Sequence, residues 1–370
     1  RFFASASAYV YENRRGAFDR SRERRGQVMK RVSLDKLNEL LSALSSDGAV
    51  YAPVRRDEKD VYFSKWTDGA DVDLTVLKTS RSAKDLFFPQ VEDIASFKTE
   101  GKKISVIAGT PDGEKFTVFG VRACDERSFS ILDKVFLAEP IDPYYKARRD
   151  NSTVITLACP APEETCFCSV FSIAPSSPAG DVTTWAKDGF LYWQSNTDKG
   201  EEAEKQVSSL LENCDETAVE EAKKQTKDIV SKMPLSNLDL SRFTPDELLP
   251  VFNSPKWISL SKACLGCGTC TFVCPTCQCY DIRDFDCGNK IQRFRCWDSC
   301  MYSDFTKMAH GNPRKSQVER FRQRFMHKLI YFPANNNGEY GCVGCGRCLS
   351  KCPISMNIVK VIKTLGAEEK

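Results

Sequence analysis

The chain has 370 residues, 41% of them hydrophobic and 28% charged, with a formal net charge of +3 at pH 7. This length is enough for two or three domains, each with a core of its own. No apolar run reaches about 18 residues and the charge is close to neutral, so we expect neither a membrane span nor a nucleic-acid partner.

The first 28 residues differ from the rest, since they hold seven Arg and no Lys and show no hydrophobic periodicity. The Arg and Ser content is typical of a transit peptide, but Glu12, Asp19 and Glu23 argue against that interpretation. We therefore interpret residues 1–28 as a disordered extension. The composition changes at Met29, where we expect the functional start.

Residues 29–235 alternate short apolar strands with helices, which predicts an N-terminal α/β domain in an α+β multi-domain chain. The expected strands are Val50–Val54, Asp60–Lys65, Ile104–Ala108, Phe116–Val121, Thr153–Leu157 and Phe190–Trp193. The expected helices are Leu34–Leu44, Glu126–Val135, Pro143–Arg149 and a pair within residues 200–232. No strand is followed by a G-x-G-x-x-G or Walker motif, so the domain shows no nucleotide-binding fingerprint.

Four cysteines of this domain lie at predicted strand ends or in a loop, namely Cys124, Cys159, Cys166 and Cys168. Buried free thiols are one interpretation, because cysteine is a common core residue. The other is a four-thiolate site for a third iron–sulfur cluster or another metal, because ligands gather in such loops. The Cys-x-Cys step is not a ferredoxin spacing, and the sequence leaves both interpretations open.

Residues 236–370 form the second predicted domain, joined to the first by a linker within Pro234–Asp246. Two cysteine runs define this domain: CLGCGTCTFVCP at residues 264–275 and CVGCGRCLSKCP at residues 342–353. Both follow C-x2-C-x2-C-x3-C-P, the spacing by which bacterial ferredoxins bind a [4Fe–4S] cluster. A zinc ribbon would need only two C-x2-C pairs and no Cys-Pro ending, so we favour two [4Fe–4S] clusters.

The first three cysteines of each run wrap one cluster, and in two-cluster ferredoxins the fourth ligates the other cluster. The expected ligands of the first cluster are Cys264, Cys267, Cys270 and Cys352. The expected ligands of the second cluster are Cys342, Cys345, Cys348 and Cys274. Clustered thiolates of this kind favour a reducing cytoplasm over disulfide formation, and their oxygen sensitivity predicts an anaerobic host.

A long insertion, residues 276–341, separates the two runs. It contains five further cysteines: Cys277, Cys279, Cys287, Cys296 and Cys300. Cys277, Cys279 and Cys300 could contribute to a further site, but no complete ligand set is present, and we favour thiols near a cluster. The insertion ends in a basic segment, Arg314–Lys328, with interleaved aromatics. Nucleic-acid binding is one interpretation of this segment, and we favour cations that face an anionic cluster or an acidic partner. His310 and His327 are not assigned as ligands.

Together these motifs resemble a family of dicluster electron-transfer subunits, typified by those of anaerobic sulfite reductases and by the beta subunits of sulfhydrogenases. The matching stretches are Phe119–Asp125, Asp142–Arg149, Cys166–Cys168, Cys264–Cys279, Trp297–Cys300, Arg320–Lys328 and Cys342–Pro353. The resemblance covers most of residues 29–370 and leaves out residues 1–28. The chain departs from the pattern at Ala123, where Pro is expected, and Cys287 and Cys296 have no counterpart in it.

This resemblance implies a cytoplasmic complex in which the chain relays electrons without catalysing a reaction itself. One implied neighbour is a subunit that binds a flavin and NAD(P)H, or a ferredoxin. The other is a catalytic redox subunit of the hydrogenase or sulfite reductase type. The resemblance does not say which catalytic partner belongs to this chain.

The alternative function is a catalytic disulfide or sulfur reductase that uses the surplus cysteines of the insertion. Such an enzyme would be expected to show a Cys-Cys-Gly ligand motif, and the chain contains no Cys-Cys dipeptide. No motif supplies a paired acid and base, and one-electron transfer between clusters needs none. We therefore favour the electron relay.

Overall fold

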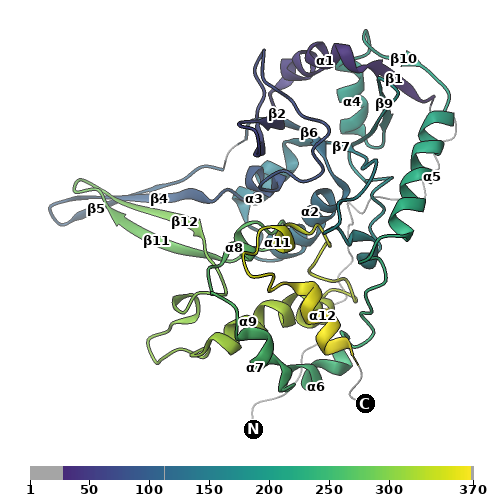
Figure 1. Ribbon diagram of the computed structural model, residues 1–370. Coiled ribbons are helices and arrows are strands. Elements are labelled where there is room, and N and C mark those ends of the chain that lie inside the picture. Colours follow the sequence, from purple (N-terminus) through teal and green to yellow (C-terminus); the bar gives the residue numbers. More distant parts are fainter. Residues whose placement is uncertain (1–27, 112, 368–370) are drawn as a thin grey trace, which may run out of the picture.

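The computed structural model describes residues 28–111 and 113–367 (Figure 1). The extension expected over residues 1–28 therefore lies, apart from Val28, outside the described residues. Over the described ranges the fold is α+β, and no helix there is both long and apolar enough to cross a bilayer.

An eight-stranded mixed sheet forms the centre of the N-terminal half. Its strands are β1 (Lys30–Ser33), β2 (Ala49–Arg55), β3 (Val61–Lys65), β6 (Phe116–Val121), β7 (Ser152–Leu157), β8 (Val182–Lys187), β9 (Phe190–Ser195) and β10 (Glu212–Asn213). They lie in the order β10-β1-β9-β8-β7-β6-β2-β3. The four neighbours β8, β7, β6 and β2 are parallel, and antiparallel strands extend both edges.

Helices cover both faces of this sheet. On one face α1 (Leu37–Leu44) and α4 (Asp198–Gln206) pack over Phe119 and Ile155. On the other face α2 (Ala123–Phe136) and α3 (Pro143–Asp150) pack over Val118 and Val154. Neighbouring strand residues point to opposite faces, so these strands are apolar at consecutive positions. A further helix, α5 (Thr217–Ser231), packs against β8.

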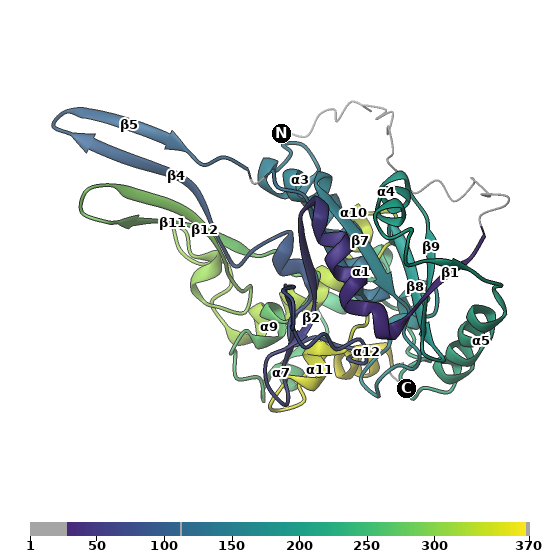
Figure 2. The same ribbon diagram turned by 90° about the horizontal axis from the view of Figure 1, so that it is seen from above.

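A second sheet of four antiparallel strands projects from the body as an arm (Figure 2). Its strands are β4 (Val91–Glu100), β5 (Lys103–Ala108), β11 (Tyr280–Asp286) and β12 (Ile291–Trp297), in the order β11-β12-β4-β5. The hairpin from the insertion thus pairs with a hairpin from the N-terminal half, with Cys296 opposite Val91. The segments on the two sides of residue 235 share this sheet.

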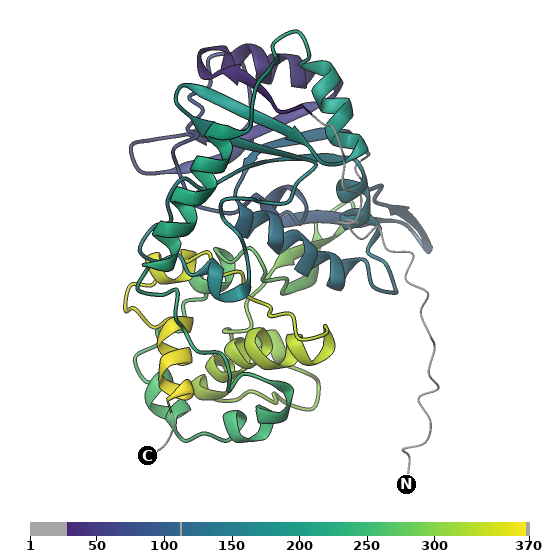
Figure 3. The same cartoon turned by 90° about the vertical axis from the view of Figure 1, so that its right-hand side faces the viewer.

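The C-terminal part is a group of short helices below the large sheet (Figure 3). They are α6 (Leu248–Phe252), α7 (Lys256–Ser261), α8 (Thr269–Phe272), α9 (Gln317–Met326), α10 (Phe332–Asn335), α11 (Arg347–Ser350) and α12 (Ile358–Gly366). A capping box of Ser316 and Glu319 begins α9, and a π-helical turn at His327–Tyr331 follows it. The core between these helices is rich in aromatic residues and includes Trp257, Phe321 and Phe325.

The structure confirms each strand and helix that the sequence predicts, with ends shifted by a few residues. The prediction missed six strands of the described residues: β1, β4, β8, β10, β11 and β12. The basic segment forms α9 as expected, but Phe321, Arg324 and Phe325 are buried in the core. Its residues Arg324 and Lys328 face the cysteines of the second ferredoxin-type run.

Candidate metal centres

The two ferredoxin-type runs fold in the same way. In the first run Gly266 and Gly268 have φ of 67° and 74°, and in the second Gly344 and Gly346 have 59° and 77°. These left-handed conformations favour glycine, and they let the chain curl so that the cysteine side chains point inward. A backbone N–H donates to the first sulfur of each run, from Gly266 to Cys264 at 3.4 Å and from Gly344 to Cys342 at 3.5 Å.

The ligand set expected for the second cluster surrounds one cavity. Its lining includes all four predicted cysteines, together with Arg324 and Lys328: Cys274, Cys342, Cys345 and Cys348. Cys274 comes from the first run and the other three from the second, as the crossed ligation of two-cluster ferredoxins requires. The Cys274 sulfur is hydrogen-bonded to the Thr276 hydroxyl at 3.3 Å and to the Cys277 thiol. Both contacts, with Lys328, lower the pKa of Cys274 well below its ordinary value.

The set expected for the first cluster lies nearer the surface. Cys264, Cys270 and Cys352 pack against the C-terminal core, whereas Cys267 is exposed. The backbone N–H of Met356 donates to the Cys352 sulfur at 3.2 Å. Burial raises the pKa of Cys270, which also feels the charges of Cys264 and of Cys348 from the second set. The two sets are therefore neighbours, and the first has an edge that reaches solvent.

Two buried cations border the second set without a carboxylate partner. The side chains of Arg324 and Lys328 form no ion pair with Asp or Glu in the described part of the chain. The Arg324 Nε has no hydrogen-bond partner there, while its guanidinium is hydrogen-bonded to Cys348. Burial by itself would lower the pKa of Lys328, but its electrostatic interaction with Cys274, Cys277 and Cys342 raises it above its ordinary value. Buried cations need a nearby anion, and a thiolate-ligated iron–sulfur cluster supplies one, so these residues fit a cluster.

A third buried cation, Lys84, connects the N-terminal half to this set. Its ammonium donates to the carbonyls of Cys274 at 3.1 Å and Cys277 at 3.0 Å and lies 3.5 Å from the centre of the Trp297 ring. Burial lowers its pKa, and the electrostatic interaction with Cys277 and Cys274 opposes that effect. Sequence reasoning missed Lys84, because nothing in the Ser82–Leu86 segment indicates a ligand contact.

We predict that Lys328→Met makes the reduction potential of the second cluster more negative. The substitution removes a positive charge beside Cys274 and Cys342, so the extra electron is less well stabilised. The expected shift is on the order of 60 mV, which corresponds to a tenfold change in a one-electron equilibrium. An EPR-monitored redox titration measures it. Lys360→Met, at an exposed position, is the control, and equal potentials in both variants would contradict the prediction.

The structure also brings together the four cysteines of the N-terminal half. Burial raises the pKa of Cys168 to about 12, with the charges of Cys159 and Cys166 contributing. Cys124, in the first turn of α2, feels the charges of Cys168 and of Cys345. The four thiols therefore lie within electrostatic range of one another and of the second set. This arrangement fits a third cluster as a tetrathiolate site.

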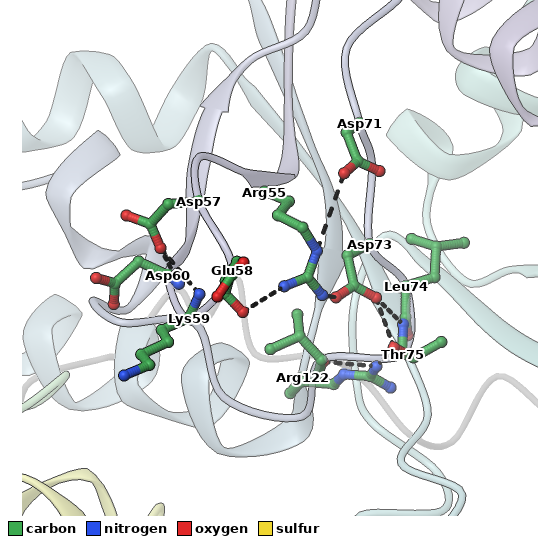
Figure 4. A network of polar contacts seen from close by, with 11 residues as sticks. Arg55, Asp57, Glu58, Lys59, Asp60, Asp71, Asp73, Leu74, Thr75 and Arg122 are labelled. Atoms are coloured by element: carbon green, nitrogen blue, oxygen red, sulfur yellow. Dashed lines mark hydrogen bonds and ion pairs between the residues drawn. The ribbon is translucent and has the colours of Figure 1, made fainter.

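Arg122 fixes the strand ends that carry two of these cysteines. It stands at the N-cap of α2 and donates to the Ala158 carbonyl at 2.7 Å and to the Cys159 thiol. Its other Nη donates to the Leu74 and Val76 carbonyls at 2.6 and 2.9 Å. Figure 4 shows this loop, in which Asp73 is held in turn by Arg55 and Thr75. A buried cation thus adjoins the third set as well.

A direct junction connects the third set with the second. The loop that carries Cys166 and Cys168 packs on the second run, where Phe167 N–H donates to the Gly344 carbonyl at 2.9 Å. A Cβ at Gly344 would lie 2.4 Å from the Phe167 carbonyl oxygen, so only glycine allows this approach. Beside it, buried Arg347 forms a two-pronged ion pair with buried Asp125, one contact measuring 2.8 Å.

The surplus cysteines separate into two groups. Cys277 donates its thiol proton to Cys274, and Cys279 and Cys300 are hydrogen-bonded to each other, so these three lie close to the second set. Cys287 is exposed at the arm's tip, and Cys296 lies within β12.

Cys214 packs at the edge of the core that contains Met29 and Trp185. Burial lowers the pKa of His327 to about 4, which leaves this imidazole neutral at pH 7.

Among residues 28–111 and 113–367, no three His, Cys, Asp or Glu side chains are arranged to hold a single metal ion. The four cysteines of the second set instead line one cavity and come from both ferredoxin-type runs, with Arg324 and Lys328 in the same lining.

Comparison with known proteins agrees with this geometry. A family model described as a 4Fe-4S dicluster domain matches residues 263–356, a range that contains both ferredoxin-type runs. The curated sulfhydrogenase 2 subunit beta of Pyrococcus furiosus is 32% identical over 335 residues, which are 88% of this chain and 94% of that protein. No solved structure matches the chain.

Proposed function

Because the chain belongs to the family of sulfhydrogenase beta subunits, we propose that it relays electrons to or from the catalytic subunit of a cytoplasmic oxidoreductase complex. Its dicluster domain makes it an iron–sulfur electron-transfer subunit with two [4Fe–4S] clusters. The electron donor or acceptor on the other side is a flavin or NAD(P)H-binding subunit, or a ferredoxin. The catalytic subunit is of the hydrogenase or reductase type.

The observation that carries this proposal is the continuity of the three thiol sets. Cys124 neighbours Cys345, and Cys348 neighbours Cys270, so the third, second and first sets follow one another through the molecule. When bound, clusters at these sites supply one-electron carriers whose potentials respond to burial, charge and hydrogen bonds to sulfur. Arg324, Lys328 and Arg347 hold positive charge along this path, and the exposed Cys267 brings its end to the surface.

We also propose that Cys124, Cys159, Cys166 and Cys168 ligate a third cluster. Four converging thiols with a buried Arg122 at their side support it, as does their contact with the second set. With this cluster the N-terminal α/β part, residues 29–235, belongs to the electron path and is joined to the dicluster part, residues 236–370, at the Arg347–Asp125 ion pair.

The experiment that tests the relay is a stepwise reduction of anaerobically purified protein followed by EPR. We expect three one-electron couples with magnetic coupling between neighbouring reduced centres, because the ligand sets are neighbours. Protein that takes up no electrons, or whose centres are zinc, would contradict the proposal.

The arm is where we expect a partner subunit to bind. On one face of the arm sheet Val106 of β5, Phe97 of β4 and Ile291 of β12 lie side by side, with Ile104 next to Val106 on β5, and Ile104, Val106 and Ile291 are exposed. Monomeric soluble proteins rarely expose such a contiguous apolar patch, which marks a surface for another protein. The occupant we propose is an apolar surface of a partner subunit of the complex.

We predict that Val106→Asp weakens assembly with the partner subunits encoded by neighbouring genes by about 10- to 100-fold. The loss follows from about 1.5–3 kcal/mol for one buried aliphatic side chain. Ser105→Asp, on the opposite face of the same strand, is the matched control. Co-purification with quantified subunit ratios measures the effect, and equal assembly of both variants at unchanged iron content would contradict it.

A further inference from the structure

Two surplus cysteines meet at the root of the arm. Cys279 immediately precedes β11 and Cys300 follows β12, and the pairing of Tyr280 with Trp297 brings the two ends of the hairpin together. The thiols of Cys279 and Cys300 are hydrogen-bonded to each other, and the backbone N–H of Cys300 also donates to the Cys279 sulfur. Neither cysteine belongs to the three ligand sets.

We propose that Cys279 and Cys300 form a redox-active dithiol/disulfide pair that exchanges two electrons with the iron–sulfur path. The proposal rests on the electron relay proposed above for the source of its electrons. The pair then carries two electrons at a time, whereas each neighbouring iron–sulfur cluster carries one.

The backbone around the pair is already held in position. The Asp298 N–H donates to the Cys279 carbonyl at 2.9 Å. The Ser299 side chain is fully buried, and its hydroxyl accepts from Thr271 at 2.8 Å and from the Met301 N–H at 3.2 Å. Disulfides require a narrow range of Cα and Cβ separations, and the paired ends of the hairpin hold the two residues on neighbouring segments of a fixed backbone.

The surroundings also favour thiol exchange. The hydrogen bond from Cys300 is the main cause that lowers the pKa of Cys279 to about 7, with Lys328 contributing. A thiol with a pKa near neutral is both a good nucleophile and a good leaving group. Both residues are half-buried, so the pair lies near the surface, where the proposed exchange with the disulfide of a second molecule takes place.

The pair is close enough to exchange electrons with the second set. Cys279 lies five residues after the predicted ligand Cys274, so their Cα atoms are at most about 18 Å apart even along an extended chain. Between them, Cys277 is hydrogen-bonded to Cys274 and lies within electrostatic reach of Cys279. The positive charges of Arg324 and Lys328 favour the thiolate form of Cys300, and the same two cations border the second set.

The reaction balances as follows. The S–S bond between Cys279 and Cys300 takes up two electrons and two protons and breaks to give two thiols. The two electrons come one each from two reduced [4Fe–4S] clusters, which are thereby oxidised. The thiolate of Cys279 then attacks an external disulfide, one sulfur of which leaves as a thiol. Cys300 attacks the mixed disulfide, releases the second thiol and restores the internal S–S bond.

The test is a redox titration of the holoprotein in glutathione buffers under anaerobic conditions, with thiol alkylation and peptide mass spectrometry. We expect one peptide pair linked through Cys279 and Cys300, whose oxidised-to-reduced ratio changes tenfold per about 30 mV, the slope of a two-electron couple. Cys300→Ser should abolish the linked pair, and Cys287→Ser, at the exposed tip of the same hairpin, should keep it.

Iron and sulfide counts on the same samples separate this inference from the relay. The inference requires Cys279→Ser and Cys300→Ser to keep the iron content of the unaltered protein. A fall of iron in both variants, showing that these cysteines are metal ligands, would overturn it, as would the absence of a Cys279–Cys300 disulfide at any potential. Iron-free protein that still forms the disulfide would contradict the relay and leave no source for the electrons, so it would overturn the coupling as well.

Discussion

Arg347→Met is expected to lower the free energy of unfolding by about 3–5 kcal/mol, because it leaves Asp125 charged, buried and unpaired. The exposed fractions of the two residues are 3% and 1%, so water cannot replace the lost partner. Arg347 also donates to the Thr79 carbonyl at 3.0 Å and to the Thr79 hydroxyl at 3.1 Å, and these bonds are lost as well. Anaerobic chemical denaturation followed by far-UV circular dichroism measures the change.

Two further variants test whether the unpaired charge of Asp125 causes this loss of stability. Arg127→Met removes an ion pair with Glu339 in which both side chains are more than a third exposed, and it should cost less than about 1 kcal/mol. The double variant Arg347→Met with Asp125→Leu should be more stable than Arg347→Met alone, since the isolated charge is gone. If Arg347→Met cost no more than Arg127→Met, the ion pair would not join the two halves of the chain as described.

Cys274→Ser is expected to slow electron transfer through the chain more than 100-fold. Loss of a residue that only orients a metal ligand typically costs 10–100-fold, and we place Cys274 among the ligands themselves. Cys274 belongs to the first run in sequence, but its side chain lies in the second ligand set, in the same cavity lining as Arg324 and Lys328. Stopped-flow oxidation of the reduced protein by an artificial acceptor measures the rate, and iron per chain should fall by about four.

Cys214→Ser is the matched control for this substitution. Its thiol lies beside the core of Met29 and Trp185, away from the three ligand sets, so transfer rate and iron content should not change. Equal rates for Cys274→Ser and Cys214→Ser would show that the second set is not on the electron path.

The parts of the centres that could be predicted are those in which spacing alone determines geometry. The two C-x2-C-x2-C-x3-C-P runs curl in the same way because their glycines occupy matching positions, so the convergence of Cys274 with Cys342, Cys345 and Cys348 follows from the sequence. The α/β alternation likewise predicts the parallel strands, whose hydrophobic pattern is local.

What could not be predicted depends on contacts between distant segments. The arm pairs β4 with β12, which are almost 200 residues apart, and both strands carry many polar residues because most of their side chains are exposed or half-buried. The roles of Lys84 and Arg347 come from their position after folding, since a buried cation and an exposed one look alike in sequence. The Cys279–Cys300 contact similarly depends on the closure of the β11–β12 hairpin.

Iron and acid-labile sulfide per chain, measured on anaerobically purified protein and on Cys124→Ser, test the central claim most directly. The three-cluster relay predicts about twelve of each in the unaltered protein and about eight in the variant, at four per [4Fe–4S] cluster. About eight of each in both samples would contradict the third cluster and remove the N-terminal half from the electron path, and zinc in place of iron would contradict the whole account.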